Sequence, residues 1–251
     1  YRVNLVLSGA PEGLVFEEDP DDASQVIASF FGWLFQNADS TYSTLAGNNT
    51  CTQEDRDDDN AGGYSPSSST GEHSYTFTDA YLTSGGTDID TDLDAALTNL
   101  FYGVNFIHDY YYNLGFDEAA GNFQYDNFGL GGLGNDPVYA DAQDAWDAGS
   151  RNNASFYTPI DGGDPTYGSP RMQMYMNEPP YSYVDGDFSG DTIIHEYTHG
   201  LSIRLVGGPN VVDGLAGVQS GAMGEGWGDW FAASIYDDPV YGEYKSGDTL
   251  I

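Results

Sequence analysis

The chain has 251 residues, of which 39% are hydrophobic and 15% aromatic, so it can bury a sizeable core. A disordered acidic chain would lack those aromatic residues. There are 40 acidic residues against 6 basic ones, which gives a formal net charge of −34. Such a charge repels nucleic acid phosphates and anionic membranes, and we expect neither as a partner.

Two interpretations of the charge compete. One is a polyanion that binds cations or basic proteins, and the other is a carboxylate-rich surface that stays hydrated in strong salt, as in halophile proteins. The acidic residues are spread along the chain, and only "QEDRDDDN" at 53–60 forms a true run. This distribution favours the salt-adapted surface, because at about 1 M salt the Debye length is only about 3 Å.

Cysteine usage and hydropathy set further limits. Cys51 is the only cysteine, which excludes an internal disulfide. The sequence starts at Tyr1 without a basic-then-apolar leader, and no apolar run approaches 18 residues. We therefore expect a water-soluble chain, either mature or cut from a longer precursor.

The first half of the chain predicts strands followed by one long helix. Short apolar stretches such as "YRVNLVL" (1–7) and "HSYTFTDAYL" (73–82) alternate with Gly, Asn, Asp and Ser clusters, which indicates strands and loops. Residues 92–114 carry apolar side chains at helical spacing, with Gly115 as a stop. A loop region rich in Gly and Asp follows at 129–149.

The second half predicts two strands and then two helices. "NNASFYTPI" and "RMQMYM" have strand character, and the alternating Met172, Met174 and Met176 indicate core positions rather than metal ligands. A helix is predicted from Asp191 to about Leu205, and another should carry "GAMGEGWGDWFAASIY". The sequence thus predicts an α+β fold with a β-rich lobe at 1–185 and a helical lobe at 186–251.

The predicted helix from Asp191 contains the pattern H-E-x-x-H. His195 and His199 lie four positions apart, so both rings face the same side and can reach one metal ion, about 2.0–2.1 Å from each nitrogen. Glu196 can lean toward the remaining coordination position and accept a proton from a metal-activated water. The alternative is a pair of structural histidines beside a solvated glutamate.

A catalytic zinc ion needs a third protein ligand, and the next predicted helix offers one. Glu225 lies 26 residues after His199 in "GAMGEGWGD". Asp229 is one turn further on and could accept the free ring N–H of a ligand histidine, which fixes the tautomer. Small residues around Glu225 would let the two helices approach closely, although a surface role for Glu225 remains the alternative.

With these residues the chain resembles the fungalysin family of secreted metalloendopeptidases, relatives of thermolysin. The resemblance extends over most of the chain and includes the following segments: "FGW" (31–33), "GNN" (47–49), "FYGVNFIHDYYYNLGFDEAAGNFQYDNFGLGGLGNDPV", "AQDAWDAGSRNNASFYTPIDG", "SPRMQMYMNEPP", "DGDFSGDTIIHEYTHGLSIRL" and "GAMGEGWGDWFAA". Departures are Gly228, where the family usually has serine, and the acidic insertions at 17–22 and 53–60.

The resemblance implies roles for individual residues. His195, His199 and Glu225 would bind one zinc ion per chain, and Glu196 would act as the general base. "NNASF" is similar to the edge strand that aligns substrate in thermolysin-like enzymes, so Asn153 and Ala154 would hydrogen-bond the peptide backbone; a plain edge strand is the alternative. The resemblance further implies a removed pro-segment and a donor histidine for the oxyanion beyond residue 251, so we expect an incomplete catalytic domain that is poorly active alone.

Three further candidates carry alternatives. Asp185, Asp187 and Asp191 offer oxygen ligands for calcium, but their spacing differs from an EF-hand loop, and Asp191 also fits as the N-cap of the zinc helix. His108 lies in an apolar helical stretch and is predicted to be a core residue. His73 is predicted in a loop or strand.

The sequence therefore predicts a secreted, extracellular zinc endopeptidase that acts on protein or peptide substrates as a monomer, with the peptide between the two lobes. A non-catalytic protein that is stabilised by zinc is the alternative. The glutamate at 196 argues against it, because a structural zinc ion needs a closed fourth position and no base.

Overall fold

The computed structural model describes residues 28–29, 32–37, 40–41, 43–166 and 168–247. Its strands are β1 (Phe35–Asn37), β2 (Ser40–Thr41), β3 (Thr50–Glu54), β4 (Val138–Ala142), β5 (Ala154–Tyr157), β6 (Arg171–Met174), β7 (Met176–Asn177) and β8 (Val184–Asp185). Its helices are α2 (Ala80–Thr83), α3 (Leu93–Asn113), α4 (Gly190–Leu205), α5 (Val218–Tyr236) and α6 (Glu243–Ser246), with short 3₁₀ turns η1 (Glu118–Ala120) and η2 (Gly186–Phe188). Helices and a mixed sheet in one chain confirm the predicted α+β class.

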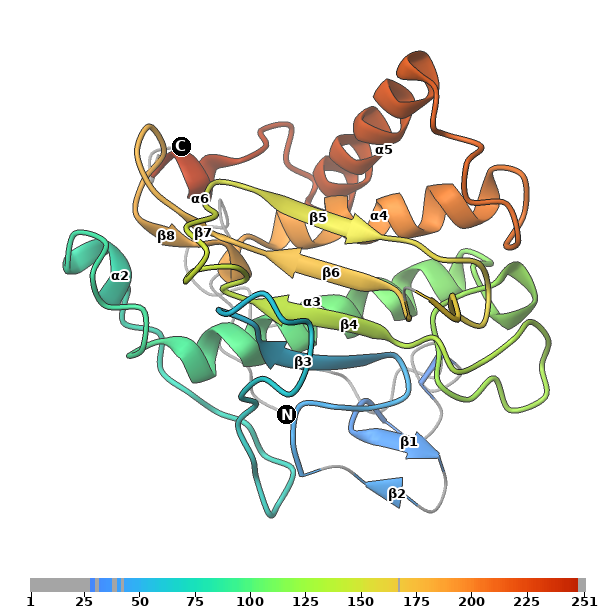
Figure 1. Cartoon of the computed structure of the whole chain (residues 1–251), viewed down its shortest axis with the longest axis horizontal. Coiled ribbons are helices and arrows are strands. Elements are labelled where there is room, and N and C mark those ends of the chain that lie inside the picture. The colour runs from blue at the N-terminus through green and yellow to red at the C-terminus, as the bar shows by residue number, and fades with distance from the viewer. Residues whose placement is uncertain (1–27, 30–31, 38–39, 42, 167, 248–251) are drawn as a thin grey trace.

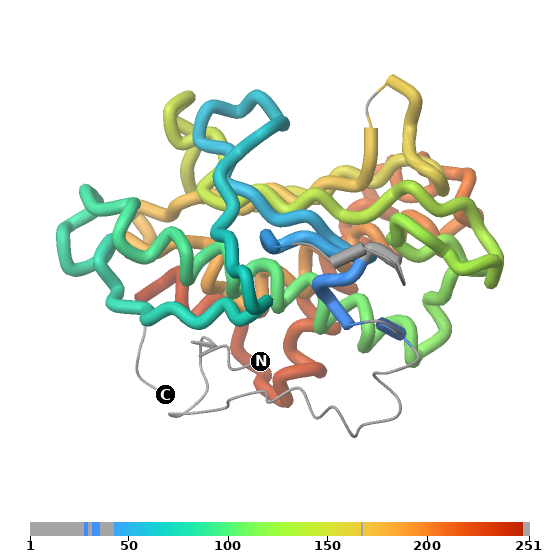
Figure 2. The backbone as a smooth tube through the Cα atoms, turned by 90° about the horizontal axis from the view of Figure 1, so that it is seen from below, coloured from blue at the N-terminus to red at the C-terminus, as the bar shows by residue number. Residues whose placement is uncertain are grey.

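The main sheet has the strand order β3-β4-β6-β5. Its first three strands are parallel, and β5 joins antiparallel to β6, so β5 is an edge strand. Helices α3 and α4 lie behind this sheet in Figure 1, and Figure 2 shows α3 and α5 on the same side of it. One face of the sheet is thus covered by helices, and the β5 edge lies next to α4.

Helix α3 forms where its apolar spacing predicts it. Leu97, Leu100, Val104 and Ile107 fall on one face and are fully buried. The helix ends at Asn113, and Gly115 follows with a φ of 101°, a conformation that glycine adopts without steric cost. The predicted stop at Gly115 is confirmed.

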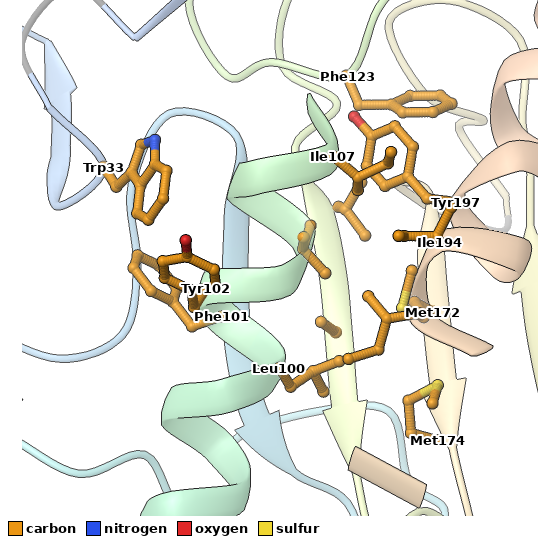
Figure 3. Packing of buried hydrophobic residues seen from close by; sticks show 14 of the residues in the cluster. Trp33, Leu100, Phe101, Tyr102, Ile107, Phe123, Met172, Met174, Ile194 and Tyr197 are labelled. Atoms are coloured by element: carbon orange, nitrogen blue, oxygen red, sulfur yellow. The ribbon is translucent and has the colours of Figure 1, made fainter. Parts of the chain in front are cut away.

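The core lies between α3, the sheet and α4, where Leu100, Met172, Ile194 and Tyr197 meet (Figure 3). Met172, Met174 and Met176 are all buried, which confirms their prediction as core residues. The same cluster of buried side chains includes residues of the sheet and of α4 and α5. A division into two lobes at residue 185 stays a prediction.

A buried ion pair fixes the C-terminal end of α4. Arg204 and Asp136 have no exposed surface, and Nη2 of Arg204 donates to Oδ2 of Asp136 over 2.9 Å. The guanidinium also donates to the carbonyls of Pro159, Gly121 and Ile160. Loss of Arg204 would leave a buried carboxylate uncompensated, at a cost of about 3–5 kcal/mol. This anchor holds α4 in its orientation against the sheet.

Not every predicted strand forms. "YRVNLVL" lies outside the described residues. The prediction of a strand at "HSYTFTDAYL" is wrong, because residues 74–79 have no regular structure and α2 begins at Ala80. The reason is Asp92, whose carboxylate accepts from the backbone N–H groups of Thr78 and Ala80 and from the Thr78 hydroxyl. These donors are therefore satisfied without a neighbouring strand.

No described helix has the length and apolar character that a membrane span requires.

Candidate metal centre

Helix α4 presents both histidines to one point. His195 and His199 are one turn apart, and their ring centroids are 4.8 Å from each other. His195 is only 8% exposed. Burial lowers the pKa of His199, which favours the neutral imidazole that binds metal ions. The predicted helix from 191 to 205 is confirmed with one additional residue at its start.

Helix α5 supplies the carboxylates. Oε2 of Glu225 lies 3.1 Å from Nε2 of His195 and 3.5 Å from Nε2 of His199. One turn further along α5, Oδ1 of Asp229 lies 2.9 Å from Nδ1 of His195. The structure therefore brings together the three predicted ligands and Asp229.

The donor atoms fit a metal ion. With Nδ1–H of His195 donating to Asp229, the Nε2 lone pair of His195 faces the anionic oxygen of Glu225. Nε2 of His199 faces the same oxygen, and the potential ligand atoms of the three residues all lie within 4.8 Å of one another. Such a convergence of lone pairs needs a proton or a cation between them, and a set of two histidines and one glutamate suits zinc.

Glycines on α5 make the close approach of the helices possible. A Cβ atom at Gly228 would lie 2.7 Å from Nδ1 of His195, and one at Gly224 would lie 3.9 Å from Nδ1 of His199. Gly228 thus lies directly against the ring of His195, a predicted metal ligand. A side chain at Gly228 would require the His195 ring or the helix to shift, whereas a Cβ atom at Gly224 would make an ordinary contact.

Glu196 lies beside the histidines and is only 6% exposed. Burial raises the pKa of Glu196 to about 7, and the charges of His195 and Lys245 oppose this rise. A cation bound by the neighbouring histidines would also lower the pKa of Glu196, since it favours the carboxylate. Glu196 is therefore a buried carboxyl group that lies directly beside the potential metal ligands.

These residues line a cleft of about 530 Å³ between α4 and the edge strand β5. The α4 side contributes His195, Glu196 and His199, and the β5 side contributes the segment 152–156, which includes Asn153 and Ala154. The sequence prediction that "NNASF" lies at an edge strand is confirmed, since β5 pairs only with β6 in the sheet. Backbone hydrogen bonding to a peptide by Asn153 and Ala154 stays a prediction.

Sequence reasoning missed part of the cleft lining. Thr192, Ile203, Tyr241 and Lys245 also line it. The sequence could have pointed to Lys245, because it is the only lysine in the chain. Thr192 and Ile203 also had a signal, because they lie three residues before His195 and four after His199 on the same face of α4. Tyr241 had none, because only the packing of the segment after α5 brings it to the cleft.

Three weaker expectations have mixed outcomes. Asp191 as N-cap is wrong, since Ser189 precedes the helix and Asp191 lies inside its first turn, where it accepts from the Thr192 N–H. The carboxylates of Asp185, Asp187 and Asp191 accept hydrogen bonds from the protein, and no described metal-ligand group contains them; calcium there stays a prediction. His108 is buried and His73 lies in a loop, both as predicted.

Replacing Asp229 with asparagine should weaken zinc affinity about 10–100-fold, because the ligand His195 loses its anionic partner. The measurement is competition with a calibrated zinc chelator. Asp237→Asn is the matched control, since Asp237 is an exposed residue at the end of α5 with a positive φ that asparagine tolerates. Equal affinities for both variants would show that Asp229 does not support the ligand.

Two histidines one helical turn apart, joined by a glutamate from a second helix, define the class of H-E-x-x-H metal centres. The sequence model of the Fungalysin metallopeptidase (M36) family matches residues 1–248, and the chain belongs to this family.

Several similar proteins are named extracellular metalloproteinases. The chain is 42% identical over 237 residues to an extracellular metalloproteinase of Aspergillus flavus, covering 92% of this chain and 33% of the relative. It is also 42% identical to extracellular metalloproteinases of Fusarium vanettenii (86% of this chain, 32% of the relative) and Aspergillus fumigatus (92% and 34%). The chain spans about a third of the length of these curated relatives.

Proposed function

We propose that the chain forms the zinc-binding part of an extracellular endopeptidase. The observation that carries this proposal is the convergence of His195, His199 and Glu225 beside the buried Glu196, in a cleft bordered by a free sheet edge. Membership of a metallopeptidase family supports it, as do the relatives' names as extracellular metalloproteinases. One zinc ion per chain is the expected content.

The residues divide the work of peptide hydrolysis among them. His195, His199 and Glu225 hold the zinc ion, which when bound polarises the scissile carbonyl and acidifies water. Glu196 takes a proton from the attacking water and delivers it to the leaving amide nitrogen. Asn153 and Ala154 align the substrate backbone along β5, because an edge strand can pair with an extended peptide.

The mode of cleavage separates an endopeptidase from an enzyme that trims chain ends. We expect internal cleavage of peptides blocked at both termini, since the cleft is bordered by a strand edge and the proposed backbone contacts need no free terminus. Mass spectrometry of the products identifies the cut. Cleavage restricted to unblocked peptides would contradict this proposal.

Salt adaptation and the remaining properties belong to the same proposal. We propose that the protein is a monomer, that it is released from a pro-segment, and that it is stable in strong salt. Stability in strong salt accounts for the net charge of −34 without a polycation partner.

We expect the thermal midpoint of unfolding to rise between about 0.1 and about 3 M NaCl, because screening reduces repulsion among the carboxylates. Scanning calorimetry measures the midpoint. Sucrose at matched osmolality is the control, since it is excluded from protein surfaces but screens no charge. A midpoint that stays flat in NaCl, or rises equally in sucrose, would contradict electrostatic salt adaptation.

A further inference from the structure

Lys245 has an unusual place in this molecule. It is the only lysine of a chain with 40 acidic residues, and it lines the candidate cleft together with Glu196 and Tyr241. Its helix α6 lies beside the start of β5 (Figure 1), and its carbonyl accepts from the Ser182 N–H. The only lysine of the chain therefore lines the cleft beside Glu196.

Lys245 differs from every other described cation. The described arginines each have a carboxylate oxygen within 4.0 Å, in the pairs Arg56–Asp90, Arg151–Glu178, Arg171–Asp141 and Arg204–Asp136. Within the described part of the chain, the Lys245 ammonium has no salt bridge of this kind. Among the described residues, a cation without a carboxylate partner in so acidic a protein requires an explanation.

The surroundings of Lys245 make the lack of a carboxylate partner within the described structure unfavourable. Burial lowers the pKa of Lys245, and the negative charges of Asp191 and Glu196 oppose this at longer range. A partly desolvated ammonium group is stabilised when a carboxylate approaches it closely. Glu196 and Glu225, the acidic residues that line the cleft, are already engaged in the proposed proton transfer and metal binding.

We infer that Lys245 is a specificity-determining residue, whose ammonium group binds a substrate carboxylate in the cleft. The carboxylate belongs either to an acidic side chain or to a free C-terminus. This inference rests on the proposed peptidase function. It predicts that the enzyme prefers anionic peptides although its own surface repels them.

The test uses zinc-loaded protein with Glu196→Gln, which binds peptides without cleaving them. Fluorescence anisotropy compares the affinities of a labelled peptide that carries one glutamate and of its glutamine analogue. The comparison is repeated for a series of peptides in which this residue occupies each position in turn. A second pair compares a free C-terminal carboxylate with an amide, which separates the two sources. We expect the acidic member of one pair to bind about 3- to 10-fold more tightly at the lowest salt that preserves the fold.

Lys245→Met keeps the apolar stem and removes the charge, so the affinity ratio should fall to about one. Lys245→Arg keeps the charge and should retain a preference. No preference in the parent, or the same preference in the methionine variant, would overturn the inference. In protein with intact Glu196, a further contradiction would be an equal loss of kcat for acidic and neutral peptides, since Lys245 would then act through Glu196 and not through a substrate carboxylate.

Different results would contradict the inference about Lys245 and the proposed peptidase function. If protein with intact Glu196 cleaves neutral peptides without a charge preference, only the role of Lys245 is wrong. If it cleaves no peptide but binds acidic ones through Lys245, the recognition stands and the peptidase proposal fails.

Discussion

Glu196→Gln should lower kcat for peptide hydrolysis about 10²–10⁴-fold while zinc content and fold are retained. The amide has nearly the same shape as the carboxyl group but cannot accept the proton of the attacking water. Glu196 is buried in the cleft beside the ligand histidines, so no exposed group can easily replace it. The measurement is steady-state hydrolysis of a quenched fluorescent peptide at equal zinc occupancy.

Two controls make this result specific. Glu72→Gln changes an exposed glutamate that does not line the cleft and should leave kcat near that of the parent. Circular dichroism and metal analysis of Glu196→Gln show whether the fold and zinc persist. A Glu196→Gln variant that holds zinc and hydrolyses peptide at nearly the parental rate would exclude Glu196 as the base.

Removing one metal ligand should have a different signature. His199→Ala is expected to lose bound zinc, from about one ion per chain to well below that after dialysis, because a catalytic site holds zinc through only three protein ligands. Hydrolysis should disappear with the metal. Plasma mass spectrometry of the dialysed protein measures the stoichiometry.

His73→Ala is the matched control, because His73 lies in a loop and does not line the cleft. Neither ring nitrogen of His73 has a hydrogen-bond partner in the described structure, so its removal breaks no polar contact there. This variant should retain zinc. Full zinc occupancy in His199→Ala would refute the ligand assignment.

The metal centre was predictable because its chemistry is local. The four-residue spacing of His195 and His199 sets their geometry once a helix forms, and Glu225 and Asp229 repeat that spacing on the next helix. The apolar periodicity of α3 and the alternation of Met172, Met174 and Met176 likewise depend only on neighbouring residues. In each case the periodic spacing of the side chains along the sequence determined which residues share one face of a helix or strand.

What the sequence did not reveal depends on distant contacts. The segment "HSYTFTDAYL" has strand composition, yet Asp92 captures its backbone donors from a later part of the chain. Lys245 enters the cleft only because the chain after α5 folds back beside β5. Ser189 instead of Asp191 precedes α4, since helix ends are set by local geometry that composition specifies only within a residue or two.

The most direct test measures zinc content and peptide hydrolysis together, in molar salt, on one preparation of the chain. We predict about one zinc ion per chain, and slow hydrolysis, as expected of an incomplete catalytic domain, that a chelator abolishes and added zinc restores. The extent of recovery should follow zinc occupancy. A folded chain without zinc, or hydrolysis that persists after complete removal of the metal, would contradict the account.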